Sequence, residues 1–166
     1  MTLVTDWTRV RHYAPIEWRD DPDRALPDLV YLMDDMREDA GRPVRIHVCW
    51  EAGGHVQDSS HYATFTEYAT GVDFNIEGWS LLDQWLFVER YAFSGIGIYP
   101  FWRAPGLHAD LRRLGRDHPR LGKRWWRDDR LTAPKPNEED RRYKPIDREL
   151  LALLLAHDEK EKARGD

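Results

Sequence analysis

The chain consists of short apolar segments separated by glycine and proline, and this punctuation restricts the folds that it can adopt. From Pro27 to about Asp39, apolar residues recur at helical spacing, with proline in the first turn. Residues 44–50 and 71–76 are instead rich in β-branched and aromatic residues, and each run stops shortly before a glycine. The first half of the chain therefore predicts one amphipathic helix followed by two strands.

The next segments repeat this order. Ser80 can cap a helix that runs to about Tyr91 and has an apolar face formed by Leu81, Leu82, Trp85, Leu86 and Val88. Residues 96–101 and 107–111 are then expected to be strands. The order helix, strand, strand, helix, strand, strand predicts an α+β fold with a small, mostly antiparallel sheet flanked by helices.

The length of 166 residues suits one domain with a short appendage. We assign residues 1–130 to the domain and the Pro- and charge-rich stretch 131–144 to a linker. Residues 145–166 form a predicted C-terminal helix that Pro145 opens. Its leucine face fits either packing on the domain or self-association, and the sequence does not choose between them.

Composition excludes several functional classes. A net charge of −5 argues against a general nucleic-acid binder. The chain has no apolar run near the roughly 20 residues of a membrane span, and its first residues lack the pattern of a secretory signal. We therefore expect cytoplasmic synthesis. Cys49 is the single cysteine and lies between apolar residues, which predicts a buried, inert thiol.

Three separated polar residues form the candidate site. His61, Asp73 and His108 provide two imidazoles and a carboxylate, a suitable set for zinc that leaves a fourth tetrahedral position for water. Asp110 follows His108 at strand spacing, so both side chains are expected on one face of the sheet. A lone histidine is more often a surface or core residue than a ligand, so a reading without metal stays open.

The order of motifs resembles the zinc D-Ala-D-Ala carboxypeptidase family of peptidoglycan peptidases, which includes phage endopeptidases and has the Hedgehog/DD-peptidase fold. The resemblance covers about residues 16–126 and begins with IEW, a helix ending in DMREDAGRP, and the strand VRIHV. It continues with SSH at 59–61, GVDF at 71–74, GIGIY at 95–99, HADLR at 108–112 and RWW at 124–126.

This resemblance implies that His61, Asp73 and His108 bind Zn²⁺ and that the substrate is a peptidoglycan stem peptide or cross-link. It implies that Asp110 assists catalysis, either as a proton shuttle or by orienting a ligand. It also places Ser59, Tyr99 and Arg112 at the substrate or behind the ligands. Tyr99 and its neighbour Trp102 either pack in the core or hold a peptide or sugar.

Since the chain shows no secretion signal, the resemblance implies an enzyme that reaches the cell wall after release from the cell, as a phage or prophage endolysin, or as part of a virion. A binding or structural module that keeps the fold but hydrolyses nothing is the alternative.

The chain also departs from the family pattern. His61 and Asp73 are twelve residues apart, whereas the family motif spaces them by seven, so residues 62–70 are expected to contain an insertion. Pro105 occupies the position of a glutamate that other branches use in catalysis, which leaves Asp110, or Glu67 in the insertion, as the acid/base group. The family's arginine after the first strand is missing, so another arginine serves or the substrate differs.

Overall fold

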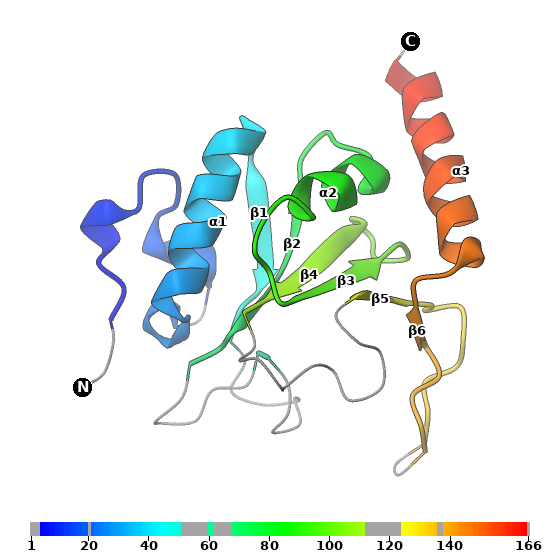
Figure 1. Cartoon of the computed structure of the whole chain (residues 1–166), viewed down its shortest axis with the longest axis horizontal. Coiled ribbons are helices and arrows are strands. Elements are labelled where there is room, and N and C mark those ends of the chain that lie inside the picture. Colours follow the sequence, from blue (N-terminus) through cyan, green and yellow to red (C-terminus); the bar gives the residue numbers. More distant parts are fainter. Residues whose placement is uncertain are drawn as a thin grey trace.

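The computed structural model describes residues 4–19, 21–50, 60–61, 68–111, 124–135 and 138–165. Within these ranges the chain has an α+β fold with a six-stranded mixed sheet in the order β1-β2-β4-β3-β5-β6 (Figure 1). Neighbouring strands are antiparallel except for β3 and β5. The predicted α+β class is confirmed. The strands are β1 (Val44–Val48), β2 (Gly71–Ile76), β3 (Gly95–Tyr99), β4 (Gly106–Asp110), β5 (Arg124–Arg127) and β6 (Tyr143–Pro145).

The N-terminal segment makes three short 3-10 turns, η1 (Trp7–Arg9), η2 (Pro15–Trp18) and η3 (Pro22–Arg24). A buried carboxylate attaches this segment to the domain, because Asp34 accepts hydrogen bonds from the backbone N–H groups of Arg11 (2.9 Å) and His12 (2.7 Å).

Helix α1 (Pro27–Ala40) confirms the first helix predicted from the sequence. Its buried stripe contains Leu29, Val30, Met33 and Met36, which are all fully shielded from solvent. Gly41 ends the helix in a left-handed conformation with φ of 58°, which glycine adopts without the steric cost that a Cβ would add.

Helix α2 (Leu81–Val88) begins as predicted, because the Ser80 hydroxyl accepts a hydrogen bond from the backbone N–H of Asp83 at 3.1 Å. The predicted apolar face is wrong at Leu86, whose exposed fraction is 56%. Gln84 is buried on that face instead, because its side-chain oxygen accepts a hydrogen bond from the backbone N–H of Ile76 at the end of β2.

The two faces of the central strands differ in chemistry. Side chains on one face are apolar and fully buried, and they join the cores of α1 and α2 in a single cluster; from the strands these are Val72, Phe74, Ile76, Ile96, Ile98, Leu107 and Ala109. Because neighbouring strand residues point to opposite faces, the alternate positions carry the polar side chains and glycines. The candidate site lies on this second face.

The C-terminal part differs from the sequence prediction in two ways. β5 and β6 are not predicted, and β6 lies at the end of the stretch assigned to a linker. Helix α3 (Arg148–Gly165) begins three residues after Pro145, because Pro145 pairs with Trp125 in the sheet. Figure 1 shows α3 at the edge of the fold beyond β6, beside α2, which it contacts.

Leucines hold α3 against the domain. Leu150 and Leu154 are buried, whereas Leu151 and Leu155 on the adjacent side of the helix are exposed by 42% and 56%. A buried carboxylate, Asp128, adds an electrostatic anchor: it forms ion pairs with the side chains of Arg130 (2.7 Å) and Lys144 (2.8 Å), and both of these also reach Glu149 of α3. Packing on the domain thus accounts for part of the predicted leucine face. In the described parts of the chain, no helix is long and apolar enough to cross a membrane.

Candidate metal centre

The sheet brings two of the three predicted ligands together directly. Asp73 on β2 and His108 on β4 are opposite each other in the antiparallel register. His61 comes from the short segment 60–61, which β2 holds in place: the carbonyl oxygen of Ser60 accepts hydrogen bonds from the backbone N–H groups of Thr70 (2.8 Å) and Gly71 (3.0 Å). Residues that are far apart in the sequence therefore meet at one end of β2.

The three side chains converge on one point. His108 Nδ1 lies 2.7 Å from Asp73 Oδ1, and His61 Nε2 lies 3.3 Å from the same oxygen. The two imidazole nitrogens are 3.1 Å apart. All three groups are shielded, with exposed side-chain fractions of 7% for His61, 14% for Asp73 and 4% for His108. This group of donors could hold a metal ion.

The other nitrogen of each imidazole binds an acceptor. His61 Nδ1 donates to the carbonyl oxygen of Cys49 at 2.9 Å, and His108 Nε2 donates to Asp110 Oδ2 at 3.2 Å. In the neutral ring only one nitrogen carries a proton. With a cation bound, which requires neutral rings, both contacts would keep that proton on the outer nitrogen and leave the lone pair of the inner nitrogen for the cation. Ser60 Oγ lies 3.1 Å from His108 Nε2 and further fixes this ring.

The electrostatics of the site reflect dense packing of opposite charges. Burial by itself would raise the pKa of Asp73, but the two nearby imidazoles outweigh it and hold that pKa well below its usual range. For His108, burial would lower the pKa, and the hydrogen bonds and charges of Asp110 and Asp73 overcome it and raise the pKa to about 9. The two carboxylates therefore favour positive charge at His108, beside the point where the donors converge.

Cys49 contributes its backbone and not its thiol. Burial, followed by the nearby charge of Asp73, raises the pKa of the Cys49 thiol well above its usual range. The thiol is free and buried, as the sequence predicts. The thiolate needed for a nucleophile or a metal ligand is therefore disfavoured at neutral pH.

Glycines on the neighbouring strand make space for the site. β3 places Gly95 beside Asp110, and a Cβ at Gly95 would lie 2.6 Å from Asp110 Oδ2. One row further, Gly97 lies beside His108, and a Cβ there would lie 2.6 Å from Nε1 of Trp125 on β5. The alternation Gly-Ile-Gly-Ile thus leaves room for large side chains on the site face and fills the core on the other.

The remaining predicted residues fall into two groups. Asp110 is 1% exposed behind His108, and Tyr99 is buried one row further along β3, where it stacks on Trp102 with ring centroids 4.0 Å apart. The predictions for Ser59 and Arg112, and for Glu67, concern residues outside the described parts of the chain.

The sequence assigned no role to Ser60, to the Cys49 carbonyl or to Trp125, although the motifs SSH and RWW contain two of these residues. Ser60 is the residue directly before His61, so its position was available. The place of Trp125 beside Gly97 depends on strand pairing, and the Cys49 carbonyl has no local signal that marks it.

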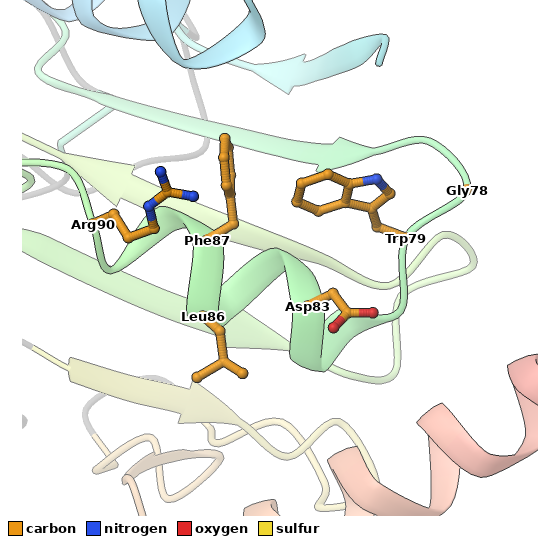
Figure 2. Close-up of a pocket in the computed structure, with 6 residues that line it drawn as sticks. All are labelled: Gly78, Trp79, Asp83, Leu86, Phe87 and Arg90. Atoms are coloured by element: carbon orange, nitrogen blue, oxygen red, sulfur yellow. The ribbon is translucent and has the colours of Figure 1, made fainter. Parts of the chain in front are cut away.

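A hollow of about 440 Å³ lies elsewhere, along α2 and the turn before it (Figure 2). The rings of Trp79 and Phe87 stand on one side of α2, in edge-to-face contact at 4.9 Å, while Leu86 points away on the other side. The residues that line this hollow include one carboxylate, Asp83, and no imidazole. The hollow therefore lacks a set of metal donors, and the chemistry of the side chains places the candidate site on the opposite face of the sheet.

No protein-family model, curated protein or solved structure matches the chain.

Proposed function

We propose that the protein is a zinc peptidase that hydrolyses a peptide bond in peptidoglycan stem peptides or cross-links, as a phage or prophage enzyme. The observation that carries this proposal is the convergence of His61, Asp73 and His108, each with its donor atom directed inward. The motif order shared with peptidoglycan peptidases supplies the substrate class. The three donors are shielded, but Asp73 keeps 14% of its side chain exposed, so solvent reaches the site at this carboxylate.

The spacing of the donors suits zinc. Bonds of about 2.0–2.2 Å in a tetrahedron separate two ligand atoms by about 3.3–3.6 Å. The three separations in the structure are 2.7, 3.1 and 3.3 Å. A zinc ion therefore requires the donor atoms to move apart, by about 0.6–0.9 Å for the closest pair, His108 Nδ1 and Asp73 Oδ1. Two imidazoles and one carboxylate are also a common protein ligand set for catalytic zinc.

The residues around the donors would orient the two imidazoles and balance the charge of the metal. When bound, zinc polarises a carbonyl group and makes water nucleophilic near neutral pH. The Cys49 carbonyl and Asp110 keep both imidazoles in the tautomer that binds a cation. Asp73 brings the negative charge that offsets the cation in a shielded site.

Of the two roles that the sequence left open for Asp110, we propose the orienting one. Its carboxylate contacts Nε2 of His108, across the ring from the nitrogen that faces Asp73. It is also 1% exposed, and its carboxylate lies against Gly95 of the neighbouring strand. A group that moves a proton to the substrate must reach it within hydrogen-bond distance, and the burial of Asp110 argues against that role.

The test is hydrolysis of purified peptidoglycan by the chain stripped with a chelator, and by the same sample reloaded with zinc. We expect one zinc ion per chain and new amino groups only in the reloaded sample. The His108→Ala variant is the control and should release none. If the zinc-loaded protein and His108→Ala release equal traces, the peptidase proposal fails. Zinc binding without hydrolysis would instead favour a metal-binding module that keeps the fold.

A further inference from the structure

We propose a substrate subsite next to the metal donors, made by His47, Asn75, Tyr99 and Trp102. It would bind an extended peptide through one main-chain carbonyl and pack against a small apolar side chain, two residues from the bond that is cleaved. This inference rests on the proposed function, because it extends the same site along the sheet.

The position of the subsite follows from the strands. Asn75 is two residues from Asp73 on β2, so both side chains lie on the same face of the sheet. Two residues along a strand span about 6.6–6.8 Å. An extended substrate advances by about 3.3–3.6 Å per residue. A substrate that runs along β2 from the metal therefore places its second residue over Asn75.

Asn75 has a fixed orientation with its donors available. His47 Nε2 lies 2.7 Å from Asn75 Oδ1, and this contact assigns the amide oxygen to the histidine side. The amide NH₂ then points away from His47, and its two N–H groups are suited to a substrate carbonyl. Both residues are partly exposed, unlike the fully buried side chains on the other face of β2.

A bulge in β1 brings His47 to this position. Ile46 is opposite Phe74 and Val48 is opposite Asp73, so His47 is an extra residue between two paired ones. A bulge bends its strand and redirects a side chain, and bulges are frequent beside functional sites. Here the redirected side chain is the one that orients Asn75.

Aromatic rings form the wall of the subsite. Trp102, from the segment between β3 and β4, stacks on Tyr99 with an interplanar angle of 13° and contacts His47 edge to face at 6.2 Å. Tyr99 is buried, whereas Trp102 is partly exposed. The stacked rings offer an apolar surface, and His47 contacts both Trp102 and the Asn75 amide. Such a pairing of an aromatic wall with a few placed polar groups is typical of ligand sites.

The test compares steady-state hydrolysis of soluble muropeptides by the zinc-loaded protein and three variants. We expect Asn75→Ala and Trp102→Leu each to raise KM about fivefold with little change in kcat, as for the loss of one binding contact. Trp79→Leu, in the hollow on the helix side, is the matched control and should keep the wild-type KM. Zinc content and the thermal midpoint are measured for each variant, so that a folding defect is recognised.

A second measurement separates this inference from the proposed function. The subsite contains none of the metal donors, so the metal-free protein should bind the same muropeptides in a calorimetric titration, and Asn75→Ala should weaken this binding about fivefold. An active wild type with unchanged KM in both subsite variants overturns the subsite alone. If the wild type binds zinc but hydrolyses nothing, weaker binding by Asn75→Ala still supports the subsite, and equal or absent binding overturns it.

Discussion

Replacing Asp110 by asparagine tests whether the site is built around oriented imidazoles. Asparagine has nearly the volume of aspartate, so it fits the space that Gly95 leaves and still offers an oxygen to His108. What it removes is the negative charge 3.2 Å from His108 Nε2 in a site that is 1% exposed. The substitution therefore changes electrostatics and ring orientation with little change in packing.

The expected loss of zinc affinity is 10- to 100-fold, the usual cost of removing a carboxylate that supports a ligating histidine. This corresponds to about 1.4–2.7 kcal/mol. We expect the loss of zinc affinity to be about 100-fold, because the carboxylate is shielded from water and a buried charge interacts more strongly than an exposed one. Part of the loss comes from ring orientation, because the asparagine NH₂ can turn towards His108 and displace the acceptor.

The assay is a competition for zinc between the protein and a chelating dye, at fixed pH and ionic strength. Asp83→Asn is the matched control, since Asp83 is an exposed carboxylate on α2, and it should keep the wild-type affinity. Unchanged zinc affinity in Asp110→Asn, together with a fall in kcat of a hundredfold or more, would refute the orienting role. That result would assign Asp110 to proton transfer.

Three further predictions concern the stability of the fold, at the strand next to the site and at the attachment of α3. Gly97→Ala places a Cβ 2.6 Å from Trp125 Nε1 and should destabilise the fold by about 1–3 kcal/mol, a fall in thermal midpoint of about 2–12 °C in calorimetry. Hydrogen bonds from Arg130 and Lys144 hold the pKa of Asp128 well below its usual range. The stability that Asp128 contributes is therefore present at neutral pH and is lost as the pH falls below about 4. Asp128→Asn should lower the free energy of unfolding at pH 7 by about 2 kcal/mol, and its denaturant midpoint should fall less steeply than that of the wild type between about pH 5 and pH 2. Leu154→Ala should cost about 2–5 kcal/mol in urea unfolding and Leu155→Ala less than about 0.5 kcal/mol, because their exposed fractions are 1% and 56%.

The sequence predicted the elements whose chemistry is local. The periodicity of Leu29, Val30, Met33 and Met36 defined α1, and the run 71–76 coincides with β2. These elements follow from spacing and capping, which a short window of sequence contains.

Elements that depend on distant partners could not be predicted. β5 has four residues and β6 has three, and neither shows a periodic signal of its own. Their pairing with β3 and with each other defines them. In the same way, Gln84 is a polar residue within an apolar helix face in the sequence. Its burial is explained only by the hydrogen bond that its side-chain oxygen accepts from the backbone N–H of Ile76. Long-range partners override local preference at these positions.

The geometry of the candidate site follows from the way the core sets the register of the sheet. Phe74 on β2 and Leu107 on β4 are opposite each other and fully buried against the helices. Moving one strand by a single residue would turn these side chains to the other face, at a large cost in apolar burial. The same pairing places Asp73 opposite His108 on the site face, at the distance that cross-strand neighbours always have. The core therefore specifies the ligand pair, and only His61, which the segment 60–61 supplies, needs its own anchors.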